Sequence, residues 1–168
     1  MCSGKSTLGK ELSKQLETEF IDLDEYIETT QGRSISDIFA AEGENGFRVI
    51  EAKALDNIIN SYGQSTAVIA LGGGTPCRPG VMELLNKAGT TVHLEVAVSR
   101  IVERLLLEPA KRPLIHNKSA DELTAYVEQM LSLRNPYYSK SMLNFDSSRL
   151  ETKEEIESSA RQLIEFLV

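Results

Sequence analysis

The chain has 168 residues, of which 41% are hydrophobic and 26% charged, and its formal net charge is −7. This length and composition fit one soluble domain with a single core, and the absence of eighteen consecutive apolar residues excludes a membrane span. The acidic balance argues against nucleic acid as the main partner. The two cysteines have neither metal-type nor disulfide-type spacing, and residues 1–10 contain no apolar leader. We therefore expect a cytoplasmic protein, because free cysteines suit a reducing compartment.

The first residues carry a motif for binding phosphate. Ser3-Gly4-Lys5-Ser6-Thr7 is the second half of the pattern G-x-x-x-x-G-K-[ST], and leucines at every fourth position predict a helix directly after it. In such a loop, backbone N–H groups and the helix N-terminus surround phosphate oxygens. We expect Lys5 to reach the β- and γ-phosphates of ATP and the Ser6 hydroxyl to bind Mg²⁺. The alternative is a helix start that resembles the motif by chance.

The missing first half of this motif changes what the sheet is expected to contain. The first glycine is absent because the chain begins at Met1, and the strand that normally precedes the loop is absent as well. In P-loop folds that strand is central, so its loss would leave two sheet edges unpaired and a cleft in the core. We expect the natural chain to start upstream and this chain to begin at an internal methionine.

Strand and helix patterns alternate along the rest of the chain. Short apolar runs predict strands over residues 19–24, 66–71, 90–96 and 141–146. Apolar residues at helical spacing predict helices over 55–62, 98–106, 123–131 and 156–167. Two capping boxes, Ser119 with Glu122 and Thr152 with Glu155, are expected to open the last two helices. This alternation predicts one α/β domain with a parallel sheet covered on both faces, and ligands at the carboxyl ends of its strands.

Acids and glycines follow the first two predicted strands. Asp22 and Asp24 alternate at the end of one strand, so their side chains are expected to point differently. Phosphoryl transfer needs one carboxylate near Mg²⁺ and another near the accepting hydroxyl. The alternative for Asp24 is a helix N-cap. Gly72, Gly73 and Gly74 allow a ligand to approach the backbone, and the alternative is a tight turn only.

Three arginines complete the candidate site. Arg48, which we expect in a segment flanking a helix, and Arg134, near a helix end, suit a planar carboxylate, although either residue alone is also typical of a solvated surface. Arg112 lies in a polar, proline-containing segment at residues 108–118, which predicts an exposed loop. A mobile arginine there is expected to close over the transferring phosphoryl group.

Together these segments resemble the shikimate kinases, a family in the nucleoside-monophosphate-kinase-like group of P-loop proteins. The resemblance spans nearly the whole chain. It rests on residues 3–7, 20–24, 32–39, 43–48 with Glu51, 71–74, 112–114 and 133–138. The block from residue 32 to residue 51 and the triple glycine are specific to the family, whereas the Gly-Lys-Ser-Thr tract is not.

The resemblance implies an enzyme that transfers the γ-phosphoryl group of ATP, with Mg²⁺, to the 3-hydroxyl of shikimate in aromatic amino-acid biosynthesis. It implies that residues 3–7 bind ATP, that Ser6 and Asp22 lie at the metal, and that Lys5, Asp24 and Arg112 are catalytic. It further implies that Arg48, Arg134 and residues 72–74 bind the substrate together with Asp24. Arg104 and Arg149 would lie near the nucleotide, with Arg149 near adenine and Arg112 contacting the phosphates.

The resemblance also implies a three-layer domain over residues 1–168, with a lid at about 108–118 and a substrate-binding helical segment at about 32–62. The family sheet has five parallel strands in the order 2-3-1-4-5, and its first, central strand is the one absent from this chain. We expect a monomer whose partner is a small molecule, with no nucleic acid and no membrane involved. Two alternatives remain open: another small-metabolite kinase of the gluconate kinase type, or an inactive truncated remnant.

Overall fold

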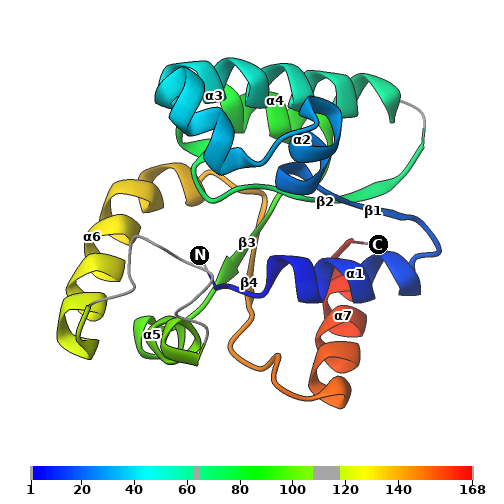
Figure 1. Cartoon of the computed structure of the whole chain (residues 1–168). Helices are drawn as coiled ribbons and strands as arrows, with labels where there is room; N and C mark the ends of the chain where they lie inside the picture. The colour runs from blue at the N-terminus through cyan, green and yellow to red at the C-terminus, as the bar shows by residue number, and fades with distance from the viewer. Residues whose placement is uncertain (1, 63–64, 108–117, 168) are drawn as a thin grey trace.

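The computed structural model describes residues 2–62, 65–107 and 118–167, and strands alternate with helices along them (Figure 1). In chain order the elements are α1 (Lys5–Gln15), β1 (Glu19–Asp22), α2 (Leu23–Gln31), α3 (Ile35–Ser61), β2 (Ala67–Ala70), the 3₁₀ helix η1 (Thr75–Cys77), α4 (Val81–Ala88), β3 (Val92–Glu95), α5 (Val98–Leu107), α6 (Ala120–Tyr138), β4 (Leu143–Asp146) and α7 (Lys153–Leu167). The predicted α/β class is confirmed. No helix in these ranges is both long and apolar enough to cross a bilayer.

The four described strands form two separate parallel pairs. β1 pairs with β2 from Glu19 opposite Ala67 onward, and β3 pairs with β4 from Val92 opposite Leu143 onward. Parallel neighbours require a crossover connection, and α2 with α3 supplies it for the first pair while α5 with α6 supplies it for the second. All four carboxyl ends are therefore followed directly by connections that can carry a site.

A groove separates the two pairs. Residues 67–70 of β2 and residues 92–95 of β3 line the same cavity of about 1240 Å³, together with apolar side chains of α1, α4 and α7. The facing edges of β2 and β3 make no ladder with each other or with any other described strand. Unpaired strand edges that face an apolar space are costly, because their N–H and C=O groups lack partners.

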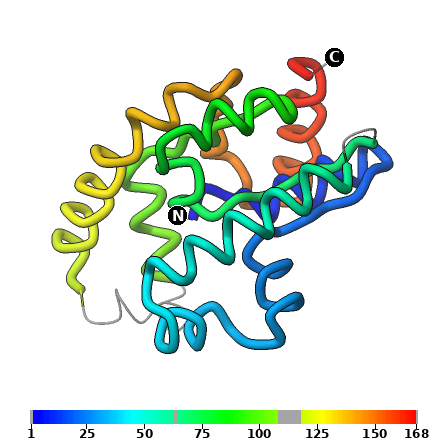
Figure 2. Tube along the Cα trace, turned by 90° about the horizontal axis from the view of Figure 1, so that it is seen from above, coloured from blue at the N-terminus to red at the C-terminus, as the bar shows by residue number. Residues whose placement is uncertain are grey.

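The hydrophobic core is divided in the same way. One cluster joins β1, α2 and α3 around Ile27, Ile38 and Ile58, and another joins α1, β4 and α7 around Leu8 and Leu163. Smaller clusters join α5 to α6 and α3 to α4. Figure 2 shows α4 alongside α3, while α1 lies against α7 in Figure 1. Each pair of strands thus has helices packed beside it, and the groove runs between the packed parts.

Local signals set several helix boundaries as the sequence predicts. Ser119 and Glu122 make both reciprocal capping-box bonds at the start of α6. Thr152 and Glu155 do the same before α7, because Glu155 N–H donates to Thr152 Oγ1 and Thr152 N–H donates to Glu155 Oε2.

Arg48 is placed differently from the prediction. It does not flank a helix but lies inside α3, which runs from Ile35 to Ser61 with a kink at Gly43, where φ is 67°. Glycine adopts this left-handed conformation at little cost, so two helical segments join there without a loop.

Candidate active site

The first turn of α1 carries the phosphate-binding motif. Gly4 is its N-cap with φ 84°, and a β-carbon at this position would collide with the side chain of Leu150. Lys5 and Ser6 follow in the first turn, where unpaired backbone N–H groups and the helix dipole attract anions. The sequence thus builds an anion-binding helix terminus at the predicted place.

Two hydrogen bonds fix the backbone just ahead of α1. Ser147 Oγ donates to the Ser3 carbonyl at 2.9 Å, and Arg104 Nη1 donates to the Cys2 carbonyl at 3.0 Å. Arg104 also contacts Glu151 Oε1 at 3.1 Å. The Arg104 side chain, which comes from α5, therefore joins the backbone ahead of α1 to the connection between β4 and α7.

The acids after β1 hold different positions from those predicted. Asp22 ends β1 and is the N-cap of α2, since its Oδ1 accepts from the Asp24 N–H at 3.1 Å, and its Oδ2 accepts from Ser6 Oγ at 2.8 Å. Asp24 lies in the first turn of α2. The expected alternation along one strand is therefore wrong, and so is the alternative of Asp24 as N-cap, because Asp22 caps the helix and ends the strand first.

The Asp24 carboxyl has an unusual electrostatic environment. It is half-buried. Burial raises the pKa of Asp24 above its ordinary 3.8, the negative charge of Asp22 raises it further, and the positive charge of Lys5 opposes the rise. Glu51 and Glu28 add smaller raising contributions. A carboxylate with a raised pKa is a better proton acceptor than an ordinary one.

Ser6 in the first turn of α1 and Asp22 at the end of β1 fit a magnesium ion. The Ser6 hydroxyl and the Asp22 carboxylate lie within 2.8 Å of each other, and both are the hard oxygen donors that Mg²⁺ prefers. In the described part of the chain, no group of three or more His, Cys, Asp or Glu side chains is placed to hold a metal. An ion here would therefore depend on phosphate oxygens and water for its remaining ligands, as Mg²⁺ with a nucleotide does.

The triple glycine after β2 brings the predicted substrate residues together. A β-carbon built on Gly72 would lie 3.3 Å from Asp24 Oδ1. One built on Gly73 would lie 2.7 Å from Arg134 Nη1, and one built on Gly74 would lie 3.2 Å from Arg48 Nη2. Three charged side chains from α2, α6 and α3 thus surround one backbone turn. Side chains in place of the glycines would fill the space that these groups share.

This turn and the phosphate loop open on the same cavity. Ser3 and Lys5 line it at one part, and Gly72, Gly73 and Arg134 line it at another. It is the same cavity of about 1240 Å³ that continues between β2 and β3. The cavity therefore connects the helix terminus with the glycine turn.

Several residues that hold the glycine turn had no predicted role. Tyr138 Oη donates to the Gly73 carbonyl at 2.6 Å, and Thr75 Oγ1 donates to Glu51 Oε1 at 2.7 Å. Glu51, only 1% exposed, also accepts from Arg48 Nη1 at 3.3 Å. The sequence held one signal for Glu51: it lies three to four residues from Phe47, Ala54 and Leu55, on the buried face of the same helix.

Not every predicted site residue joins this arrangement. Arg149 is exposed in the segment after β4, and its backbone carbonyl accepts a hydrogen bond from Ser159 Oγ. Arg112 lies outside the described residues, as does the predicted lid except Lys118. Thr7 is exposed in the first turn of α1, beside Lys5 and Ser6.

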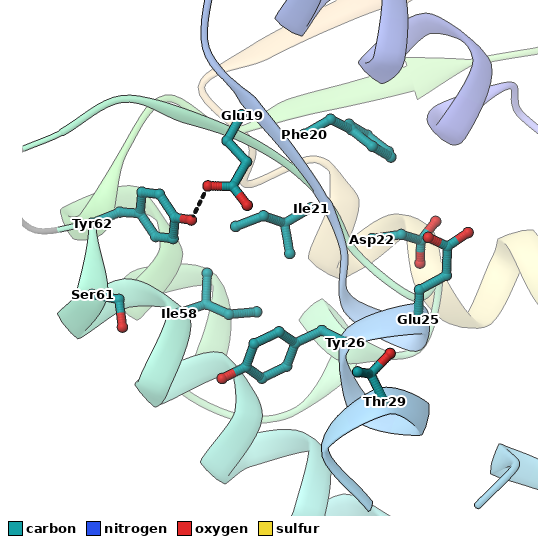
Figure 3. A pocket seen from close by; sticks show the side chains of 10 residues that line it. All are labelled: Glu19, Phe20, Ile21, Asp22, Glu25, Tyr26, Thr29, Ile58, Ser61 and Tyr62. Atoms are coloured by element: carbon teal, nitrogen blue, oxygen red, sulfur yellow. Dashed lines mark hydrogen bonds between the residues drawn. The ribbon is translucent and has the colours of Figure 1, made fainter. Parts of the chain in front are cut away.

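A smaller pocket lies beside β1 and is separate from the glycine turn (Figure 3). It measures about 320 Å³ and is lined by β1, α2 and the end of α3. Glu19 accepts a hydrogen bond from the Tyr62 hydroxyl there. Lys5, Gly72, Gly73 and Arg134 line the larger cavity and not this pocket, so the larger cavity is the candidate active site.

Comparisons with known proteins show the family of the chain. A family model described as shikimate kinase matches residues 1–168. A shikimate kinase of Parabacteroides distasonis is 38% identical over 167 residues, covering 99% of this chain and 95% of that protein. One of Azobacteroides pseudotrichonymphae is 40% identical over 158 residues, covering 94% of this chain and 92% of the other.

Solved structures give the same result. The crystal structure of shikimate kinase from Bacteroides thetaiotaomicron matches with a TM-score of 0.93 and 37% identity, covering 99% of this chain and 93% of that one. A shikimate kinase from Acinetobacter baumannii in complex with shikimate matches with a TM-score of 0.81 and 27% identity, covering 98% of this chain and 86% of the other. The chain belongs to the shikimate kinase family and has its P-loop kinase fold.

Proposed function

We propose that the chain transfers the γ-phosphoryl group of ATP to the 3-hydroxyl of shikimate, giving shikimate 3-phosphate. The observation that carries this proposal is the cavity that opens on both the first turn of α1 and the glycine turn, where Asp24, Arg48 and Arg134 meet. Family membership supports it, as does the structural neighbour whose bound ligand is shikimate.

The roles follow from the chemistry of each side chain. The helix terminus with Lys5 binds the phosphates, because fixed N–H groups and an ammonium stabilise the charge of the transferring group. Arg48 and Arg134 bind the carboxylate of shikimate through paired charge-assisted hydrogen bonds. Asp24 binds the accepting hydroxyl and takes its proton, which its raised pKa favours.

Binding both reactants in one cavity also contributes directly to the rate. Gly72 to Gly74 let the ring of the substrate approach the backbone next to Asp24, so that the hydroxyl and the γ-phosphate are held in line. Ser6 and Asp22 are the residues that would hold Mg²⁺, and that ion would supply positive charge at the phosphate oxygens. Arg112, over the phosphates, and Arg149, near adenine, remain predictions for the nucleotide side.

We also propose that the two strand pairs are the outer parts of one five-position sheet, in the spatial order β1, β2, an open position, β3, β4. The support is that β2 and β3 face the same groove with unpaired edges. This arrangement corresponds to the family order 2-3-1-4-5 with its central position empty among the described residues. It also places the carboxyl ends of β1 and β2 next to α1, where the site lies.

A monomeric state and a cytoplasmic location complete the proposal. Both cysteines are free, which suits a reducing compartment. The large exposed apolar side chains come from different helices, for example Val49 in α3, Leu84 in α4 and Phe166 in α7. Scattered residues of this kind are normal on a monomer. Sedimentation analysis at several concentrations measures the assembly state directly.

The decisive experiment replaces the proton acceptor. In Asp24→Asn, kcat for shikimate is expected to fall by about 10²–10⁴, the usual contribution of a positioned general base. ATP affinity, measured by calorimetric titration, should change little because Asp24 does not line the phosphate loop. Glu25→Gln is the matched control, since Glu25 is an exposed acid in the same helical turn. Near-normal turnover by Asp24→Asn would contradict the assigned role.

Two further measurements separate the alternatives. Coupled ADP detection with a panel of small hydroxy acids, gluconate included, tests the substrate, and a preference for gluconate would overturn the proposal. Calorimetric titration with ATP tests whether the chain binds nucleotide at all. No binding would favour an inactive remnant, whereas binding with shikimate-dependent ADP release supports the kinase.

A further inference from the structure

Glu51 is a buried carboxylate that two arginines share. Its side chain is 2% exposed, its Oε1 accepts from Thr75, and its Oε2 faces both Arg48 Nη1 at 3.3 Å and Arg78 Nη2 at 3.5 Å. A carboxylate buried this deeply is stable only when it is paired and hydrogen-bonded. The three partners come from α3, from η1 and from the residue after η1, so Glu51 joins the glycine turn to the Arg48 helix.

Arg78 is part of this arrangement through more than one contact. Its Nη1 donates to the backbone carbonyl of Arg48 at 3.3 Å, so the same guanidinium touches both Arg48 and its carboxylate partner. Its Nε–H is buried and has no hydrogen-bond partner among the described residues. An unsatisfied buried donor costs stability, so packing alone gives no reason for an arginine here.

The charges of Arg48, Glu51 and Arg78 supply a reason for an arginine at position 78. With Arg48 and Glu51 alone, the guanidinium would be neutralised by the buried carboxylate beside it. With Arg78 present, two guanidinium groups against one carboxylate leave one positive charge next to Gly74. Glu44 also contacts Arg48, at 3.0 Å, but it is 70% exposed, so water and salt screen its effect.

We propose that Arg78 is a positioning and specificity residue for the carboxylate-binding part of the site: it shares the charge of Glu51 and so leaves Arg48 positive toward an anionic substrate. The proposal rests on the proposed function, since the anion at Gly74 is taken to be the carboxylate of shikimate. Arg78 itself does not contact the substrate in this scheme, because its guanidinium lies on the Glu51 side of Arg48.

The test compares an acid with its neutral analogue. Calorimetric titration measures the affinity of the wild-type chain, Arg78→Gln and Arg78→Lys for shikimate and for its carboxamide. Arg78→Gln should weaken shikimate binding about tenfold, the size of one partly screened charge interaction, and leave carboxamide binding within about twofold. Arg78→Lys, which keeps the charge, should retain most of the preference for the acid. Arg161→Gln, an exposed arginine of α7, is the control.

The outcomes distinguish an electrostatic role of Arg78 from a purely structural one. Equal losses for the acid and the carboxamide would indicate a structural role and overturn the proposal, as would no loss in Arg78→Gln. If Arg78→Gln does not fold, a loss of acid preference in the folded Arg78→Lys variant would count against it. A wild-type chain that binds the acid selectively but does not turn it over would contradict the proposed function and leave the Arg78 result intact. A wild-type chain without acid preference would contradict both.

Discussion

Asp24 is a carboxylate held where its charge is unfavourable. Burial, Asp22 and Glu51 all raise its pKa, and only Lys5 among the named groups lowers it. Because the folded chain binds this proton more tightly than the unfolded chain does, stability falls as the pH rises from the ordinary value of 3.8 through the raised pKa. The charged side chain is therefore expected to destabilise the fold at neutral pH.

This gives a prediction that is independent of turnover. Asp24→Asn should raise the free energy of unfolding at pH 7, because the amide carries no charge to bury. The advantage should shrink as the pH falls through the raised pKa and disappear below 3.8, where the wild-type carboxyl is protonated in both states. Urea denaturation at several pH values checks the trend. A variant less stable than wild type at pH 7 would show that the charged form of Asp24 stabilises the fold.

A second prediction concerns the contribution of Arg134 to shikimate binding. Its guanidinium approaches Gly73, whose carbonyl is fixed by Tyr138. Arg134→Gln should lose about 1.5–3 kcal/mol of shikimate binding, the value of a hydrogen bond to a charged group, while the KM for ATP stays unchanged. Arg134→Lys should recover only part of the loss, because an ammonium lacks the planar fork of a guanidinium. Full recovery by lysine would indicate that only the charge matters.

At the scale of elements, α1 depends on the conformation of one glycine. Gly4→Ala should lose about 1–2 kcal/mol of stability from the left-handed backbone and more from the collision with Leu150. ATP affinity should fall as well, because the first turn of α1 must shift. Gly32→Ala is the control, since Gly32 has φ 64° but no neighbour within 4 Å of a built β-carbon. Equal ATP affinity in the two variants would contradict the assignment of the phosphate loop.

Local signals in the sequence were sufficient for most elements. The capping boxes before α6 and α7 were predictable because each is formed by residues three apart in the chain. The end of β1 was misplaced by two residues because an Asp is equally compatible with a strand end and a helix cap. The kinked α3 was predicted only in part, since Gly43 and Gly46 are poor helix formers and tertiary packing overrides that preference.

Candidate site residues could be chosen from the sequence only where the side-chain type itself suits a ligand group. Lys5, Asp24, Arg48 and Arg134 were singled out because their side chains suit phosphate and carboxylate groups and because they match the family's motifs; the structure places the last three around the glycine turn, and their roles stay predictions. Arg78, Thr75 and Tyr138 were not, because they act through contacts with segments far away in the chain: Thr75 bonds to a residue 24 positions earlier, and Tyr138 to one 65 positions earlier. No local pattern in a single sequence records a contact of that kind.

At the scale of the whole molecule, the groove between the strand pairs is expected to lower the free energy of unfolding, because it leaves two strand edges unpaired. We predict that fusing a strand of about six Val and Ile residues and a glycine ahead of Cys2 raises the free energy of unfolding by several kcal/mol, because each buried side chain contributes about 1.5–3 kcal/mol. Kinase activity should rise with it, since β2 and β3 would pair with the new strand and hold the site. Urea denaturation and coupled ADP detection give the two readouts.

The control for this experiment is a Gly-Ser extension of the same length, which adds chain but no apolar surface or strand propensity. It should leave both stability and activity unchanged. If the apolar and the Gly-Ser extensions behave alike, the groove does not accept a strand, and the proposed five-position sheet order is wrong.

Helix α1 contacts both sides of the groove, because it packs on β1 and β2 and also on α7. A nucleotide bound at its first turn would therefore resist unfolding of both halves at once, since melting either half requires α1 to detach. Saturation to a hundred times the dissociation constant adds about 2.7 kcal/mol by mass action alone. In a cell, the abundance of this protein would then follow the supply of its phosphoryl donor, because the occupied form escapes proteolysis longer than the empty one.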